Sequence, residues 1–353
     1  MSLEDRMDEE ACWQLLDRFP HGNLCGSTGQ GTPVMRTLNH AILDGALYFH
    51  GAATGEKRGM LGRPAVFGCE EVVAQIPSYW RDPISACPAT TWFQSAQVHG
   101  MLESVEDAGL KARAMSALMN RLQPEGGHLP IRVDEELYVK MLRATCVFRL
   151  VPSRLTGRNK IGQNKQPEDI LAILRGLWKR GTPQDLRGME TILAGNKRAS
   201  RPPELCGPRG VELIVHPSEC LADQAAELLR VQYWSGPYDH GQLLQAIHGA
   251  QAWIGARDPQ TGRLLGTAAA VSNGSKQAYL YDVAVDLQHQ GKGIGKALTK
   301  ALLDHAMVRG TRTVILRTRD AMELYRPFGF ELTGGGAGPD GIVTMLRKQG
   351  APA

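Results

Sequence analysis

The sequence predicts two domains of different class, an antiparallel β-barrel with a few helices followed by an α/β domain. Three observations lead to this. The chain has 353 residues, more than one hydrophobic core usually organises. Its first part contains short strand-like runs separated by turn residues, which is typical of a barrel. Its last part alternates strands with helices and contains a glycine-rich turn.

The composition describes a soluble globular protein. Hydrophobic residues make up 42% and charged residues 22%, and no run approaches the ~20 apolar residues of a membrane span. The acidic start of the chain is unlike a signal peptide, so we expect a cytoplasmic protein without membrane attachment. Seven scattered cysteines without a Cys-x-x-Cys pair suggest reduced thiols and no metal site. A formal charge of +4 is mild for this size and by itself gives no case for nucleic-acid binding, so we expect no nucleic-acid partner.

The barrel is predicted from its strands and one helix. Asp44-Gly45 stands between two apolar runs, which is a hairpin signal. The strands are expected at residues 23–28, 32–42, 46–50, 65–74, 92–105 and 145–151, with a helix at 107–122.

A helix and a linker separate the two domains. The apolar stripe of residues 166–180 predicts a helix, with Pro167 at its start and Gly181 at its end. Residues 196–210 are rich in Pro, Gly and basic side chains without apolar periodicity, which indicates a linker. We therefore expect a barrel at 1–157, a helical extension at 158–195, the linker at 196–210 and the α/β domain at 211–349.

The α/β domain is predicted from alternating elements. Strands are expected at 211–215, 252–257, 264–271, 279–285 and 313–317, and helices at 222–233, 241–247 and 296–308. Residues 290–295 form a glycine-rich turn between the fourth strand and the last helix. Unpaired N–H groups at such a helix start favour bound phosphate.

Three nucleotide-binding motifs could explain this turn. A Walker A loop needs Gly at position 290 and Ser or Thr at 297, whereas the chain has Gln290 and Ala297. The glycine spacing and the late position argue against a dinucleotide fingerprint. Gln290, Gly293 and Gly295 fit the Gln/Arg-x-x-Gly-x-Gly/Ala loop instead. With the preceding strand, Tyr325 and the later Gly-Phe pair at 329–330, they resemble the GNAT acetyltransferases.

The GNAT resemblance implies an acetyl-CoA site and catalytic residues. The backbone of Val283 and Val285 would pair with the pantetheine arm. The pyrophosphate would lie on the loop Gln290, Gly291, Lys292, Gly293, Ile294, Gly295 and Lys296. Tyr325 would be the acid that protonates the departing thiolate. Asp282 is the candidate base, because a carboxyl inside a central strand is costly to bury without a partner or a function. The alternative is a structural aspartate that accepts a hydrogen bond from a neighbouring N–H. Aromatic residues at 233, 234 and 238 could line the acceptor pocket or belong to the core.

The first domain resembles the pyridoxamine-phosphate-oxidase-like split-barrel flavoproteins, on residues 45–52, 55–57, 78–80 and 93–100. The closest branch is the one that contains the nitroimidazole-resistance proteins. Residues 158–165, 77–80 and 88–92 also resemble the flavin-binding negative transcriptional regulators. The resemblance implies a homodimer with FMN at its interface. By this resemblance, the flavin ring would be lined by Met35, Arg36, Thr37 and Leu38. The ribityl phosphate or the flavin edge would lie along His50, Gly51 and Lys57. The same pocket or the partner subunit would contribute Trp80, Trp92 and Ser95.

Together the two resemblances imply an N-acetyltransferase for a small amine, fused to a flavin-binding domain. Two other functions stay open. The protein could be a flavin-binding regulator or sensor, or the first domain could reduce nitro compounds while the second is accessory.

Overall fold

The computed structural model describes residues 5–52, 56–334, 336–338 and 340–348. Residue 55, part of the flavoprotein resemblance, lies outside this range. The chain divides into two compact units. The first comprises residues 1–72 and 91–163, and the second comprises 73–90 and 164–353. The long hairpin between two barrel strands thus contributes its end to the second unit, and each unit is described below by itself.

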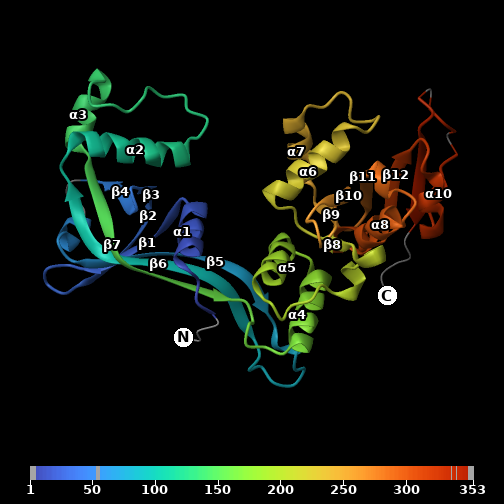
Figure 1. The fold of residues 1–353 in the computed structure, drawn as a ribbon, viewed down its shortest axis with the longest axis horizontal. Coiled ribbons are helices and arrows are strands. Elements are labelled where there is room, and N and C mark those ends of the chain that lie inside the picture. Colours follow the sequence, from blue (N-terminus) through green and yellow to red (C-terminus); the bar gives the residue numbers. More distant parts are fainter. Residues whose placement is uncertain (1–4, 53–55, 335, 339, 349–353) are drawn as a thin grey trace. The chain divides into compact units, whose positions relative to one another are not determined.

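The first unit is built on an antiparallel sheet of seven strands in the order β2-β1-β5-β6-β7-β4-β3 (Figure 1). Strand β2, at one edge, also contacts β4 near the other edge, so the sheet curls toward closure. The predicted split barrel is confirmed. The strands are β1 (His21–Ser27), β2 (Pro33–Asn39), β3 (Ala41–Leu43), β4 (Ala46–Gly51), β5 (Pro64–Ile76), β6 (Thr90–Val105) and β7 (Cys146–Lys160).

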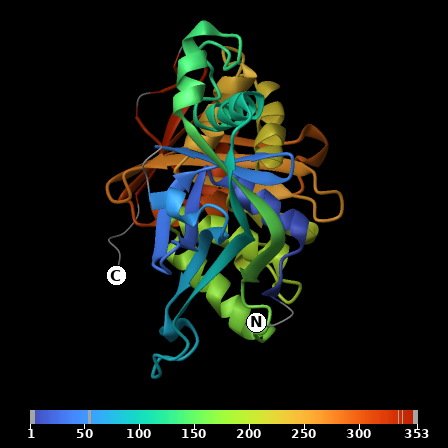
Figure 2. The same ribbon diagram turned by 90° about the vertical axis from the view of Figure 1, so that its left-hand side faces the viewer.

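Local signals explain the elements of the barrel. Asp44 and Gly45 both have positive φ, as a tight turn between β3 and β4 requires, and Leu43 pairs with Ala46. Helix α2 (Ala108–Leu122) begins where the Asp107 carboxylate accepts the Leu110 N–H at 2.7 Å, and it packs on β3 and β4 (Figure 2). Two further helices were not predicted, α1 (Glu9–Arg18) and α3 (Glu136–Ala144).

A helical pair opens the main part of the second unit. The predicted helix is α4 (Pro167–Arg180), ended by Gly181 in the left-handed conformation. It is followed by α5 (Pro183–Gly195), which the sequence analysis missed although Thr182 and Asp185 form a capping box. A Cβ at Gly188 of α5 would overlap the carbonyl oxygen of Val73, so α5 packs directly on the end of β5.

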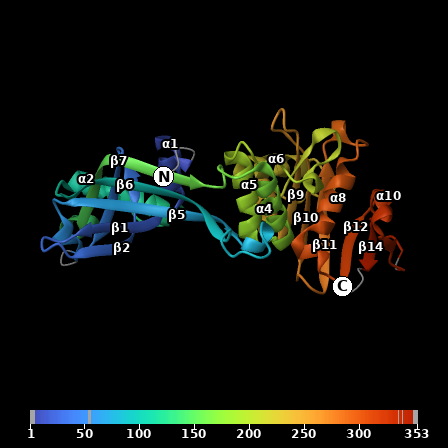
Figure 3. The ribbon, with the colours of Figure 1, turned by 90° about the horizontal axis from the view of Figure 1, so that it is seen from below.

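The rest of the second unit is a seven-stranded sheet in the order β13-β14-β12-β11-β10-β9-β8. All pairs are antiparallel except β11 and β12, which are joined through α8 as a parallel crossover and lie side by side in Figure 3. The predicted GNAT-type α/β fold is confirmed. The strands are β8 (Glu212–Ile214), β9 (Ala252–Arg257), β10 (Leu264–Ser272), β11 (Gln277–Val285), β12 (Thr313–Thr318), β13 (Glu331–Leu332) and β14 (Val343–Lys348).

Helices cover this sheet. They are α6 (Glu219–Arg230), α7 (His240–Gly249), α8 (Ile294–Asp304), α9 (Ala306–Arg309) and α10 (Met322–Tyr325). The predicted helix 296–308 is broken at His305, which has ψ 139° and caps α9 by accepting the Met307 N–H. In the described residues, no helix is both long and apolar enough to cross a bilayer.

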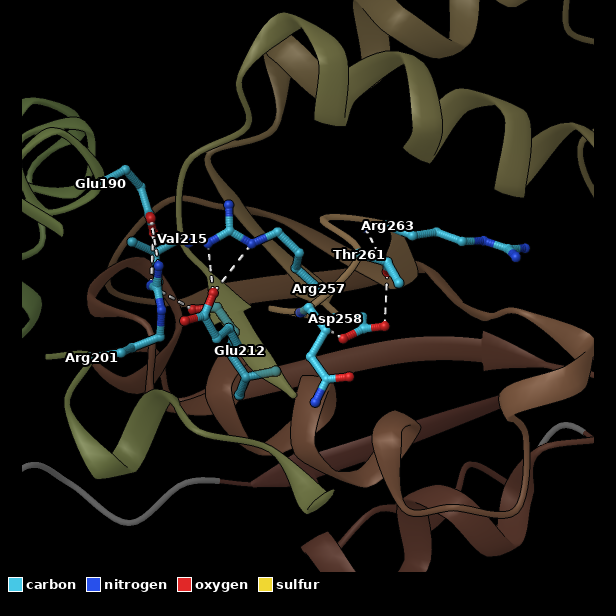
Figure 4. Close-up of polar contacts among 10 residues, drawn as sticks. Glu190, Arg201, Glu212, Val215, Arg257, Asp258, Thr261 and Arg263 are labelled. Atoms are coloured by element: carbon cyan, nitrogen blue, oxygen red, sulfur yellow. Dashed lines mark hydrogen bonds and ion pairs between the residues drawn. The ribbon is translucent and has the colours of Figure 1, made fainter. Parts of the chain in front are cut away.

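The segment 196–210, predicted as a linker, packs within the second unit. Leu205 is fully buried, and the Arg201 side chain is only 5% exposed. The Arg201 guanidinium pairs with Glu190 of α5 at 2.7 Å and donates to the Leu213 carbonyl of β8 at 3.0 Å (Figure 4). These contacts join α5 to the first strand of the α/β sheet.

Candidate functional site

The central feature of the second unit is a bulge in β11 at Asp282. Between the pairs Thr267–Ala284 and Ala269–Tyr281, one residue of β10 faces two of β11. Asp282 has φ +53°, a conformation that non-glycine residues rarely adopt inside a strand. A β-bulge of this kind redirects a side chain and is frequent beside active sites.

The Asp282 side chain lines a pocket of about 710 Å³. The pocket lies at the ends of β11 and β12, between them and the segment from α6 to α7. Its walls combine aromatic, amide, aliphatic and charged side chains. They include Tyr233, Trp234, Tyr238, Gln242, Gln245, Tyr279, Tyr281, Asp282, Arg317, Asp320 and Tyr325. The structure thus brings both predicted catalytic residues, Asp282 and Tyr325, into one cavity.

Burial sets the protonation of these groups. It raises the pKa of the Asp282 carboxyl above its usual range, and the nearby Trp234 indole opposes the rise. That indole N–H is buried and makes no hydrogen bond of ordinary geometry among the described residues. Burial also raises the pKa of the Tyr325 hydroxyl and raises that of Tyr281 to about 12. Both phenols therefore keep their protons at neutral pH, as a proton donor must.

The glycine-rich turn adjoins this pocket. Gly291 and Gly293 have φ +73° and +85°, and Gly293 is the N-cap of α8. Among the residues that the structure describes, no side chain caps the first N–H groups of α8, and Lys292 and Lys296 are exposed beside them. A Cβ at Gly295 would lie 3.6 Å from Leu324, next to Tyr325. A helix start with free N–H groups and two cations suits a diphosphate.

The predicted backbone contacts lie on the open side of β11. Its pairing with β12 ends at Leu280–Leu316, so in the described structure residues 281–285 have no ladder partner on that side. On the other side Val285 faces Gly266 of β10. The Gln290 amide donates to the Val285 carbonyl at 3.2 Å. Gln290 therefore holds the strand end, a role that the sequence motif did not indicate.

In the first unit, the predicted flavin residues fall into two groups. The edge strand β2 carries Met35, Arg36, Thr37 and Leu38, and Met35 is 61% exposed. An open hollow of about 600 Å³ beside β2 includes Met35 and Arg36. The end of β4 carries His50 and Gly51.

Lys57 lies against the end of β4. A Cβ at Gly51 would overlap the Lys57 ammonium, which is 5.9 Å from the centre of the Phe148 ring. Burial, and then the charge of Arg36, lowers the pKa of Lys57, while burial and Lys57 lower that of His50. The Lys57 ammonium therefore lies at a glycine, and the charge of Arg36 acts on it, an arrangement that suits a phosphate.

The other predicted flavin contacts lie elsewhere. Trp92 is 1% exposed and packs on Gly162, where a Cβ would overlap the indole. Trp80 belongs to the second unit and packs on Gly176 of α4, with the Arg180 guanidinium 4.7 Å from its ring centre. Ser95 is half-buried in β6 opposite Arg158. Their assignment to the flavin site, in the same pocket or from a partner subunit, stays a prediction.

Several lining residues of the second unit's pocket were not predicted, among them Tyr279, Tyr281 and Arg317. Tyr279 and Tyr281 are two residues apart in β11, and Arg317 lies one residue before the end of β12. The signal that could have found them is the Tyr-x-Tyr-Asp run, since residues i and i+2 of a strand share a face. The carboxyl ends of the parallel strands β11 and β12 also lie at one edge of the sheet.

Two family models match the chain. Residues 8–159 match the model described as pyridoxamine 5'-phosphate oxidase, and residues 222–330 match the acetyltransferase (GNAT) family.

Among curated proteins, a probable acetyltransferase of Glycine max, TAP2, is 28% identical over 39% of this chain and 54% of its own length. N-acetyltransferase 8B of Mus musculus is 37% identical over 25% of this chain and 40% of its own length. The chain thus spans about half the length of the curated relatives it matches.

Among solved structures, a putative 5-nitroimidazole antibiotic resistance protein of Bacteroides thetaiotaomicron covers 43% of this chain and 85% of its own. The two are 17% identical, with a TM-score of 0.35. The family matches agree with the two folds described above, and the chain carries a pyridoxamine 5'-phosphate oxidase-like domain at residues 8–159 and a C-terminal domain of the GNAT acetyltransferase family at 222–330.

Proposed function

We propose that this protein transfers the acetyl group of acetyl-CoA to a primary amine in the pocket beside β11. The observation that carries the proposal is the junction of two features in one unit. The uncapped start of α8 offers N–H groups and lysines for a diphosphate. The adjoining pocket holds a half-buried carboxyl and a buried phenol, Asp282 and Tyr325.

The reaction needs three proton movements, and the site offers a group for the first two. The ammonium form of the amine first gives one proton to Asp282, because only the neutral amine has a free electron pair. The amine nitrogen then attacks the thioester carbonyl carbon, and the carbon–sulfur bond breaks. The sulfur leaves with its electron pair and takes the Tyr325 hydroxyl proton. The second amine proton is lost as the amide forms and restores the phenol through solvent. The products are an N-acetyl amide and the free thiol of CoA.

Much of the rate enhancement would come from holding the two reactants in position. Holding the amine and the thioester together converts an encounter in solution into a reaction between neighbours. The open backbone at residues 281–285 can pair with an extended amide-containing chain as an added strand would. The pantetheine arm has amides of this kind. The thioester would then lie beside the pocket that holds Asp282 and Tyr325.

The test is the release of free CoA thiol from acetyl-CoA with a panel of primary amines. Tyr325→Phe keeps the ring and removes the hydroxyl, so the single-turnover rate should fall about 10²-fold while the affinity for acetyl-CoA stays unchanged. The matched control is Tyr138→Phe, a half-buried tyrosine of the first unit, which should behave as wild type. A wild-type single-turnover rate in Tyr325→Phe would reject the role of the phenol. Release of no thiol with any amine would reject acetyl transfer.

We further propose that the first unit holds FMN in a homodimer, with the phosphate on Lys57 and Arg36. The observation that favours it is the close approach of the Lys57 ammonium to Gly51, because any side chain at position 51 would displace that ammonium. Met35 and its neighbours on β2 would contact the flat ring from the open hollow. When bound, FMN supplies one- and two-electron redox chemistry. Lys57 supplies a positive charge at a fixed place.

Flavin fluorescence titration of the full chain tests this assignment. Lys57→Ala should weaken FMN by about 1.5–3 kcal/mol and leave riboflavin, which lacks the phosphate, nearly unchanged. Lys140→Ala, an exposed lysine of the same unit, is the control. Light scattering should give the mass of a dimer. An equal loss for both flavins would remove only the role of Lys57, whereas a monomer that binds neither flavin would overturn the whole assignment.

A further inference from the structure

Aromatic side chains are concentrated in the pocket of the second unit. Five of the chain's eight tyrosines line it, at positions 233, 238, 279, 281 and 325, together with Trp234. Tyr233 and Trp234 meet edge to face with ring centres 4.8 Å apart. A site for a small aliphatic amine needs no such wall, whereas flat rings pack well on one another.

The charges of the pocket are few and unevenly buried. Asp282 is the half-buried acid, and Asp320 is exposed. Two exposed arginines lie near Asp320. Arg317 lines the pocket and reaches Asp340 only at 3.9 Å. The Arg319 guanidinium stacks 3.6 Å from the centre of the Tyr233 ring. One positive charge can therefore be accepted at Asp282, but a second one would meet these arginines.

We propose that the acceptor is a primary monoamine that carries an aromatic ring, with its ammonium at Asp282 and its ring among Tyr233, Trp234 and Tyr238. This inference rests on the proposed acetyl transfer and names the substrate class of the same pocket. It separates aromatic monoamines from polycations such as polyamines and aminoglycosides, and from aliphatic amines. The bond changes are those given above, since the aromatic ring takes no part in them.

The first experiment compares initial rates of thiol release with phenethylamine, propylamine and spermidine. The expected kcat/KM of phenethylamine is at least about 10-fold above that of each of the other two. Equal values for phenethylamine and propylamine, or a higher value for spermidine, would overturn the inference while leaving acetyl transfer in place.

If acetyl-CoA binds but no amine is turned over, calorimetry of phenethylamine against the full chain decides. Binding of phenethylamine, at least about 10-fold tighter than that of propylamine, supports the inference even though the proposed transfer fails. No binding of phenethylamine overturns it. The failure of the substrate class and the failure of the reaction therefore give different results.

A variant tests the aromatic wall itself. Tyr238 is 54% exposed, so Tyr238→Ala should preserve the fold. The KM of phenethylamine should rise about 3- to 10-fold more than the KM of propylamine. A merely structural role would change both amines alike. Tyr138→Ala is the control outside the pocket.

A second variant tests the positive charge near the pocket. Arg319→Gln should raise the kcat/KM of spermidine relative to that of phenethylamine.

Discussion

Asp282 is the residue on which the proposed chemistry depends most. Its positive φ costs of order 1–3 kcal/mol, and such backbone strain persists where the surrounding structure enforces it. Here the strain comes with a bulge that directs a carboxyl into an aromatic pocket. Burial raises the pKa of that carboxyl, so it holds a proton more readily than an exposed aspartate would.

The raised pKa predicts the pH dependence of the reaction. A base must be ionised to act, so kcat/KM should fall as the pH falls through the pKa of Asp282, at a pH above the usual aspartate range. Asp282→Asn should lower the rate by about 10²-fold or more and lose this acid limb. The measurement is the ratio of wild-type to variant rate between pH 4 and 9, in which the titration of the amine cancels. Glu331→Gln, at an exposed glutamate, is the control. A ratio that stays constant with pH would exclude Asp282 as the base.

For a single residue, the sequence indicates which chemistry the side chain can do better than it indicates which neighbours the side chain contacts. Asp282 and Tyr325 were predicted from residue type and motif, and they share a pocket. Trp80 and Trp92 stay predicted flavin contacts from an ordered resemblance, and within the chain their indoles pack on Gly176 and Gly162. A pattern of residue types does not specify which neighbour a large side chain covers, because that depends on packing.

Among the elements, α5 is tied to the α/β sheet by a buried ion pair. Glu190 accepts from Arg201 at 2.7 Å and from the Val215 N–H at 2.8 Å, as Figure 4 shows. Beside it, Arg257 pairs with Glu212 at 2.5 Å. A buried pair adds little net stability while intact, but the loss of one partner leaves an unpaired buried charge.

Arg201→Leu should therefore destabilise the second unit by about 3–5 kcal/mol. Arg230→Leu is the matched control, because Arg230 is 59% exposed in its pair with Glu227 and should cost less than about 1 kcal/mol. Urea unfolding followed by tryptophan fluorescence measures both. Equal small losses in the two variants would show that the pair does not fix α5.

Element ends were predictable where capping residues fix them. Pro167 and Gly181 gave the ends of α4, and the Asp44-Gly45 turn gave the β3–β4 hairpin. Helix α5 carries comparable signals in Thr182, Pro183 and Asp185, but Gly188 and Gly195 weaken its helical pattern. The break of α8 at His305 depends on tertiary contacts: the ring packs on Trp178, whose indole donates to Asp304 at 2.9 Å.

In the whole molecule, each unit contains a fully buried neutral histidine. Burial lowers the pKa of His40 in the first unit and of His305 in the second to about 4, against 6.5 unperturbed. Below pH 6.5 these two histidines become protonated in the unfolded chain but stay neutral in the folded protein. The contribution of each buried histidine to the free energy of unfolding is therefore fully present above about pH 6.5. It is lost as the pH falls toward 4, by up to about 3 kcal/mol for each histidine.

Urea unfolding between pH 7.5 and 5 tests this, before most carboxylates titrate. His40→Phe and His305→Phe keep a ring and remove the titrating group, so each should flatten the loss in its own unit. Stability that does not change over this range in the wild type would contradict the assignment of both histidines as buried and neutral.

The two folds were predictable because each has local signatures, namely hairpin turns in the first and the strand, glycine turn and helix in the second. The contribution of residues 73–90 to the second unit was not, since it depends on contacts between segments far apart in sequence, such as Val73 with Gly188. The position of the pocket beside β11 likewise follows from the β11 bulge, which has no sequence signal of its own.

The central claim is that the turn before α8 binds the diphosphate of acetyl-CoA. Calorimetry of acetyl-CoA with wild type, Gly293→Asp and Gly293→Asn tests it most directly. Both variants strain the backbone at φ +85° alike, and a Cβ there meets Pro208 only at 3.6 Å, so the charge is the main difference between them. The account predicts wild-type binding, and an affinity for Gly293→Asp at least about 10-fold below that of Gly293→Asn. Equal affinities in folded Asp and Asn variants, or no binding by the wild type, would contradict it.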